Sequence, residues 1–169
     1  MASVPLVTVR HASPADLEIL VEFSAAMAFE TEGRQLDRAR LHRGTSAVFD
    51  IADRGFYMVA EVDSQADPHI VGQLLITFEW SDWRQATFWW IQSVYVRPEW
   101  RRKGVYRAMH HAVLQSARQR GDVCGVRLYV EGENEVAQAV YRRVGLALSS
   151  YRIFEEDFVL AKPEKAQNT

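Results

Sequence analysis

Residues Gln92–Ala108, QSVYVRPEWRRKGVYRA, join an apolar strand to an amphipathic helix through a short basic turn. Backbone N–H groups at the start of such a helix have no partner within it, and the helix dipole places positive potential there. Arg101, Arg102 and Lys103 add charge, and Gly104 allows close approach of a ligand. The stretch therefore predicts an anion site, typically for phosphate. An exposed basic turn without a ligand is the alternative interpretation.

Hydrophobic periodicity on both sides of this turn predicts a mixed α/β domain of the α+β type. Phe88–Val96, the helix Gly104–Gln119 and a short buried strand at Val126–Val130 predict one parallel β-α-β crossover. Glu79–Gln85 is predicted as a turn because it contains Ser81 and Asp82. The other predicted strands are Val4–Arg10, Phe56–Val62, Ile70–Phe78, Leu146–Leu148 and Tyr151–Leu160. The other predicted helices follow Ser13-Pro14, Asp37 and Asn134, the last of them over Glu135–Val144.

These elements predict a central sheet of about six or seven strands, mostly antiparallel, flanked by about four helices. One domain over residues 1–160 and a polar tail over residues 161–169 are expected.

Apolar residues make up 48% and charged residues 25% of the chain, as in soluble globular proteins. Cys124 is the one cysteine, so an internal disulfide is excluded and a cytoplasmic location is expected. Neither a signal peptide nor an apolar run of about 18 residues is present, which predicts no membrane partner.

Charge is distributed unevenly along the chain. The formal net charge is only −2, and this small value predicts no nucleic-acid partner. His11–Asp37 contains six acidic residues and one basic residue, for a net charge of −5. Arg97–Arg120 contains seven basic residues and one acidic residue, for a net charge of +6. The uneven charge predicts a basic site for an anionic ligand and an acidic site for a cationic one. Two solvated helix faces of different charge are the alternative.

Arg101–Tyr106 resembles the acyl-CoA-binding motif of the GNAT superfamily of N-acetyltransferases, Gln/Arg-x-x-Gly-x-Gly/Ala. Tyr106 departs from this motif because it stands where the family has Gly or Ala, so its side chain must point away from the pyrophosphate of a bound acyl-CoA. Asn134–Leu146, NEVAQAVYRRVGL, resembles a second segment of the family, with Leu146 in place of Phe. The two motifs together cover about residues 88–146. A more particular likeness is to GNAT-like sequences with an EWSDWR…FWWIQSVYV run, for which no substrate is defined.

The resemblance implies acetyl-CoA as cosubstrate, held between two central strands that splay apart. It implies that the backbone of Val94 and Val96 pairs with the pantetheine arm, and that amides from Arg102 to Arg107 hold the pyrophosphate. Asn134 is expected to contact pantetheine or to serve only as a helix cap. The expected cofactor-binding residues are Val94, Tyr95, Val96, Arg101, Arg102, Lys103, Gly104, Val105, Tyr106, Arg107 and Asn134.

The resemblance also implies direct acetyl transfer to a primary amine in a ternary complex. Tyr141 matches the family's tyrosine general acid, and a half-buried helix tyrosine is the alternative. Glu79 is the hypothesis for the general base, and Asp82 lies nearby, with surface solvation as the alternative for each. The resemblance also allows a chain of water molecules in place of a single carboxylate. The acceptor is not identified by the sequence, but the acidic segment Glu30–Asp37 slightly favours a small cationic amine. We expect no metal, because the five histidines form no chelating pair. A homodimer is compatible with the family, and an acyl-CoA-binding module without catalysis is the second function considered.

Overall fold

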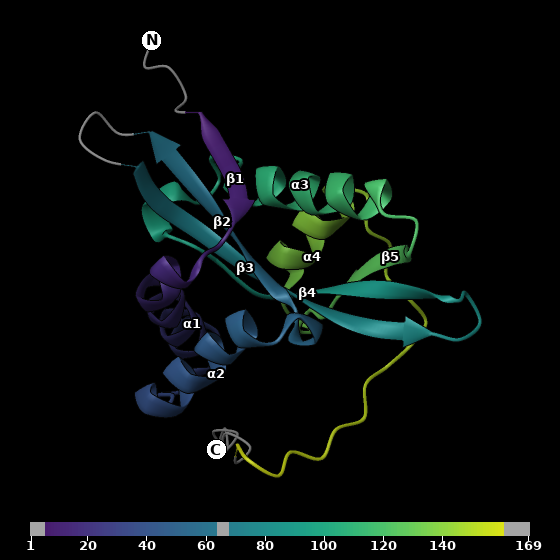
Figure 1. Cartoon of the computed structure of the whole chain (residues 1–169), viewed down its shortest axis with the longest axis horizontal. Helices are drawn as coiled ribbons and strands as arrows, with labels where there is room; N and C mark the ends of the chain where they lie inside the picture. The colour runs from purple at the N-terminus through teal and green to yellow at the C-terminus, as the bar shows by residue number, and fades with distance from the viewer. Residues whose placement is uncertain (1–5, 64–67, 161–169) are drawn as a thin grey trace.

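A computed structural model describes residues 6–63 and 68–160, which form one sheet with helices on both faces (Figure 1). The predicted polar tail, residues 161–169, lies outside the described residues. The strands are β1 Val7–His11, β2 Phe56–Asp63, β3 Pro68–Ser81, β4 Ala86–Val96 and β5 Val123–Leu128. The helices are α1 Leu17–Glu32, α2 Arg38–Asp50, α3 Val105–Gln119 and α4 Glu135–Arg143. Three short 3-10 turns lie at Pro14–Asp16, Ala52–Arg54 and Pro98–Trp100.

The sheet follows chain order, β1-β2-β3-β4-β5. Its first three pairings are antiparallel, and β4 and β5 are parallel with α3 as the crossover. The predicted mixed sheet, the four helices and the single parallel crossover are therefore confirmed.

Local signals fix the ends of several helices. The side chain of Asp37 accepts a hydrogen bond from the Arg40 amide and caps α2. Gly33 adopts a left-handed conformation (φ 63°) and ends α1. No helix among residues 6–63 and 68–160 is long and apolar enough to cross a membrane.

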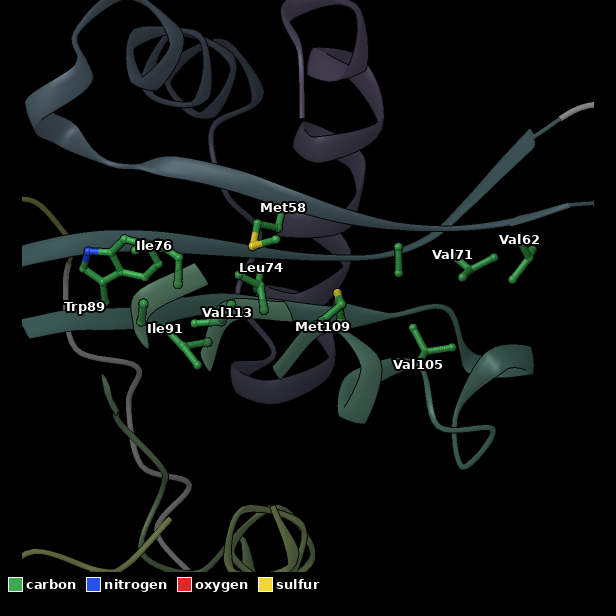
Figure 2. Close-up of a cluster of buried hydrophobic side chains, with 12 residues drawn as sticks. Met58, Val62, Val71, Leu74, Ile76, Trp89, Ile91, Val105, Met109 and Val113 are labelled. Carbon is green, nitrogen blue, oxygen red and sulfur yellow. The ribbon is translucent and has the colours of Figure 1, made fainter. Parts of the chain in front are cut away.

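The core lies on both faces of the sheet. Alternation along β2 sends Met58 and Ala60 to the face covered by α3, and Tyr57 and Val59 to the face covered by α1 and α2. Figure 2 shows the larger cluster, in which Met109 and its neighbours on α3 pack against the side chains of β2, β3 and β4. We expect this three-layer packing to supply most of the stability of the chain, because burial of apolar area is the main favourable term in folding.

Two expectations about the strands are wrong. Residues 146–160 contain no strand, so the described sheet has five strands rather than six or seven. Tyr151–Leu160 has the aromatic and branched residues of a strand, but a strand also needs to pair with a neighbour, and this segment pairs with no strand of the described sheet. Glu79 lies in β3 rather than in a turn, since β3 extends to Ser81. Pairing of Glu79 with Phe88 continues the hairpin beyond the predicted boundary.

The last strand also differs from its prediction. It spans Val123–Leu128 rather than Val126–Val130, and its six residues are each only partly buried. Its exposure follows from its place at the edge of the described sheet, where one side of the strand has no neighbour.

Candidate functional site

Strand β4 extends beyond its pairing with β5. The parallel register runs from Thr87–Val123 to Ile91–Leu128 and then ends, although β4 continues to Val96. Among the described residues, the edge of β4 after Ile91 therefore has no strand beside it on the β5 side. An extended ligand with amide groups could pair with that edge as a strand does.

A β-bulge lies in the same part of β4. Gln73 pairs with Tyr95 and Leu75 with Gln92, so one residue of β3 faces two residues of β4. Ser93 in this bulge has a positive φ of 50°. The buried side chain of Gln73 donates hydrogen bonds to the Ser24 hydroxyl at 3.0 Å and to the Ser93 carbonyl at 3.4 Å. The bulge is thus held in place from the sheet interior, and a polar Gln73 within an apolar strand is the signal that could have indicated it.

The basic turn leads from β4 into α3. Arg101 Nε donates to the Val96 carbonyl at 2.9 Å, which ties the turn to the unpaired end of β4. Gly104 is the N-cap of α3 with φ 84°, a conformation that favours glycine. No atom lies within 4 Å of the position that a Cβ would take there. The first amides of α3 have no partner within the helix, so they and this open approach can hold an anion.

The predicted cofactor residues differ in what their side chains do. The Val105 side chain is 1% exposed and packs in the core, so only its backbone could meet a ligand. Arg102, Lys103 and Arg107 are exposed around the helix start. Arg101 is already paired, since its Nη2 donates to Glu30 Oε2 at 2.5 Å. A ligand at the helix start would therefore meet the exposed charges of Arg102, Lys103 and Arg107, whereas the charge of Arg101 is paired with Glu30 on α1.

The Tyr95 hydroxyl also reaches Glu30, to whose Oε1 it donates at 3.1 Å. Burial raises the pKa of Tyr95, and the charge of Glu30 acts in the same direction. Glu30 thus joins the acidic helix α1 to both β4 and the basic turn.

Tyr106 points into the molecule rather than toward the helix start. Its ring packs in the α3-side core cluster, 5.8 Å from the His110 ring and 5.6 Å from the Tyr141 ring, edge to face. Burial raises the pKa of Tyr106 well above its usual range, with a further contribution from Tyr141. The bulky residue at this motif position therefore leaves the backbone at the start of α3 accessible. It also places the predicted general acid against the predicted cofactor segment.

Tyr141 lies on α4 and lines a cavity of about 900 Å³. Burial raises the pKa of Tyr141, so its phenol keeps its proton at neutral pH, as a general acid requires. Asn134 is seven residues earlier, and its side chain accepts a hydrogen bond from the Ala137 amide at 3.0 Å. The structure therefore shows Asn134 as the N-cap of α4, and it does not place Asn134 on the cavity wall.

Glu79 lines the same cavity, so the structure brings together the two residues predicted to act on protons. Its carboxylate accepts hydrogen bonds from Arg127 Nη1 at 2.9 Å and from Trp90 Nε1 at 2.5 Å. A carboxylate has about four lone-pair sites, so these two bonds leave it further acceptor capacity. The cavity wall consequently carries an acceptor, Glu79, and a donor, the Tyr141 hydroxyl.

The partners of Glu79 are not evident from the sequence around it. The Arg127 guanidinium lies 3.6 Å from the centroid of the Phe88 ring. Trp90 stacks on Tyr129 with ring centroids 4.3 Å apart. Phe88 can take this position because residue 125 is glycine, where a Cβ would come within 2.7 Å of the Phe88 ring. Arg127 could have been noticed as a lone cation within the otherwise apolar segment VCGVRLYV. No group of three or more His, Cys, Asp or Glu side chains suited to a metal occurs in residues 6–63 and 68–160.

A family model described as the acetyltransferase (GNAT) family matches residues 19–146 of this chain. Among solved structures, a possible acetyltransferase from Clostridium difficile 630 has 35% sequence identity and a TM-score of 0.82. That alignment covers 92% of this chain and 99% of the other. The search of curated proteins finds no match.

Two further structures are similar in fold at low identity. A predicted acetyltransferase with acetyl-CoA from Clostridium acetobutylicum is 16% identical, with a TM-score of 0.70 over 89% of this chain and 96% of that one. AAC(6')-Iy, in complex with the bisubstrate analogue CoA-S-monomethyl-acetylneamine, is 16% identical. Its TM-score is 0.67, over 90% of this chain and 98% of that one.

Proposed function

Because this chain belongs to the acetyltransferase (GNAT) family, we propose that it transfers an acetyl group from acetyl-CoA to a primary amine by direct attack in a ternary complex. The observation that carries the proposal is the junction of the unpaired end of β4 with the amide-rich start of α3. Coenzyme A has an extended amide-containing arm followed by a pyrophosphate. The junction offers a binding surface for each of these parts in the same order.

The cofactor would lie along residues that match the family motif. The backbone of Val94 and Val96 would pair with the pantetheine arm, since that edge of β4 lies beyond the last β4–β5 pair. The amides of residues 102–107 would hold the pyrophosphate, and the charges of Arg102, Lys103 and Arg107 would favour it. An N–H near Val94 would stabilise the negative charge that develops on the thioester oxygen.

The chemistry requires one proton to leave the amine and another to reach the sulfur. A free alkyl ammonium has a pKa near about 10.4, so it must lose a proton before it attacks. Glu79 accepts that proton, and the amine lone pair forms a C–N bond to the thioester carbon. The C–S bond then breaks, the sulfur leaves with its electron pair, and the Tyr141 hydroxyl protonates it. Glu79 releases its proton to solvent, and the second proton that the nitrogen loses as the amide forms passes through solvent to the Tyr141 phenolate. One proton is thus released per turnover, and both groups are restored.

A small cationic amine is the acceptor class that we propose on the strength of one carboxylate and two aromatic rings rather than of net charge, because Arg127, Arg142 and Arg152 also line the cavity. The cavity that contains Tyr141 also carries the Glu79 carboxylate and the aromatic rings of Trp90 and Tyr129. Carboxylates and aromatic faces both attract an ammonium group.

Calorimetric titration with acetyl-CoA, with adenosine as the control ligand, tests the cofactor assignment. We expect saturable micromolar binding, about −8 kcal/mol, that requires the phosphates. Arg102→Gln should weaken it several-fold, because Arg102 lies at the start of α3. Arg118→Gln, also exposed but in the last turn of the same helix, is the matched control and should leave it unchanged. No binding at millimolar ligand would contradict the proposal.

Release of the CoA thiol in the presence of a panel of amines tests catalysis. Binding without turnover across the panel would favour the acyl-CoA-binding module over an enzyme. Glu79→Gln should lower the rate mainly at low pH, where the amine is most protonated, and Asp82→Asn in the adjacent turn is the control. A pH–rate profile unchanged by Glu79→Gln would exclude Glu79 as the base.

A further inference from the structure

The helix that carries the proposed general acid has few side-chain contacts with the packed part of the molecule. Helix α4 spans nine residues, Glu135–Arg143, and none of them is buried. In the described chain its side-chain hydrogen bonds, together with the cap from Asn134, join only residues 131–142 to one another. A catalytic group on such a helix needs a contact from outside the helix to fix its position.

Tyr106, in the first turn of α3, supplies that contact. Its ring lies edge to face with the Tyr141 ring, at an interplanar angle of 64° with centroids 5.6 Å apart, a geometry in which aromatic rings attract. This is the one ring contact of Tyr141 among residues 6–63 and 68–160. The Tyr106 ring also packs against the buried cluster on the α3 side of the sheet. Its neighbours on α3, Val105 and Met109, are at most 1% exposed, so Tyr106 joins Tyr141 to the packed part of the molecule.

The contact depends on the ring of Tyr106 rather than on its hydroxyl. The hydroxyl oxygen is buried and has no hydrogen-bond partner in the parts of the chain that the structure describes. Phenylalanine could therefore make the same contact. Gly or Ala, which the motif Gln/Arg-x-x-Gly-x-Gly/Ala has at this position, could not, since neither carries a ring. The contact is thus a feature of this chain that the motif does not contain.

The backbone of the same residue belongs to the proposed cofactor site. The Tyr106 amide is one of those at the start of α3 that would hold the pyrophosphate. One residue thus meets the cofactor through its backbone and Tyr141 through its side chain. We propose that Tyr106 is a positioning residue, which holds the Tyr141 hydroxyl at the thioester sulfur of bound acetyl-CoA. This inference rests on the acetyl transfer proposed above, and it concerns the step in which the Tyr141 proton passes to the sulfur as the C–S bond breaks.

Replacement of the ring tests the proposal kinetically. Tyr106→Ala should lower kcat about 10- to 100-fold, because the general acid is no longer aligned with the sulfur, while the KM for acetyl-CoA changes less than about 2-fold. Tyr106→Phe keeps the ring and should restore the native kcat. Val113→Ala, about two turns farther along α3 in the same buried cluster, is the control for lost packing and should keep the native kcat. A Tyr106→Phe chain as slow as Tyr106→Ala would overturn the proposal.

A double-mutant cycle shows whether Tyr106 acts through Tyr141. A chain with Tyr141→Phe has already lost the proton donor, so adding Tyr106→Ala should slow it further by less than about 2-fold. A full additional loss would mean that Tyr106 serves the reaction through another group, and the positioning role would then be wrong.

Fluorine NMR measures the ring contact without any turnover. The six tyrosines of the chain are labelled with fluorotyrosine, and Tyr141→Phe and Tyr151→Phe identify the signals of these two residues. In the native chain the Tyr141 signal should be displaced from that of Tyr151, which is 77% exposed. Tyr106→Ala should move the Tyr141 signal toward the Tyr151 position, and Tyr106→Phe should leave it displaced.

The NMR result separates this inference from the proposed function. A Tyr141 signal that Tyr106→Ala leaves unchanged would overturn the positioning role, whatever the rate of turnover. A native chain that shows the displaced signal but acetylates no amine would contradict the proposed function, and Tyr106 would still be the residue that holds Tyr141 in place.

Discussion

Residues 6–119 and residues 121–160 differ in how they are packed. Every buried residue in the described parts of the chain lies between Asp16 and Ala117, and residues 121–160 contain none. Met109 on α3 is fully buried, whereas Val136 on α4 is 79% exposed. The candidate cofactor segment belongs to the packed region, residues 6–119, and Tyr141 belongs to residues 121–160. The segment proposed to bind the cofactor therefore lies on the packed part of the chain, whereas the proposed general acid lies on a part that contains no buried residue.

The largest contrast should appear in stability. Met109→Ala removes a fully buried side chain from the cluster in Figure 2 and should lower the free energy of unfolding by about 2–5 kcal/mol. Val136→Ala should change it by less than about 0.5 kcal/mol, because that side chain is exposed. Urea denaturation measures both values. Equal losses for the two variants would show that α4 is packed as tightly as α3.

A pair of tyrosines should separate activity from stability. Tyr141→Phe should lower kcat about 100-fold or more, because the general acid is lost, and should leave the KM for acetyl-CoA nearly unchanged. Tyr57→Phe removes a buried hydroxyl that bonds to Thr45 and should lower stability by about 1 kcal/mol without changing kcat. Initial rates and thermal unfolding of both variants provide the measurements. A Tyr141→Phe enzyme with the native rate would assign Tyr141 a packing role.

Two carboxylates should respond differently to acid. Arg10 donates hydrogen bonds to Asp16 and lowers its pKa to about 2. Since the folded pKa lies below the unfolded value of 3.8, the pair stabilises the fold above that pH, and this stability is lost as the pH falls toward 2. Asp16→Asn should lower stability at pH 7 by about 1–2 kcal/mol and flatten its decline in acid.

Asp122 is the matched control for Asp16. It pairs with Arg120 in full solvent just before β5, where an ion pair contributes little. Asp122→Asn should leave the dependence of stability on pH unchanged. If the acid unfolding curves of the two variants coincide, burial does not distinguish the Arg10–Asp16 pair from the Arg120–Asp122 pair.

The packed region was largely predictable, because its signals are local. Gly104 and the apolar spacing along Val105–Gln119 predicted α3, and Asp37 predicted the start of α2, as observed. Pro14 correctly marked a helical start, although it begins a 3-10 turn before α1. In each case a capping residue or a periodicity decides the structure without help from distant parts of the chain.

The errors arose where a distant partner decides the structure. Tyr151–Leu160 has strand composition, but it pairs with no strand of the described sheet, and composition alone does not decide pairing. Glu79 lies in a strand because Phe88 pairs with it, and its bonds to Arg127 and Trp90 come from two other places in the sequence. The β4 bulge depends on Gln73 in a neighbouring strand. Periodicity along one segment does not contain this information.

The position of the core has a consequence for synthesis on the ribosome. The last buried residue in the described chain is Ala117, so the buried cluster is complete in sequence before β5, α4 and residues 146–160 have been translated. At about 5–20 residues per second, the stretch from Arg120 to Leu160 adds about 2–8 s. During that interval the emerging chain can collapse around α3 while residues 121–160 are still being made.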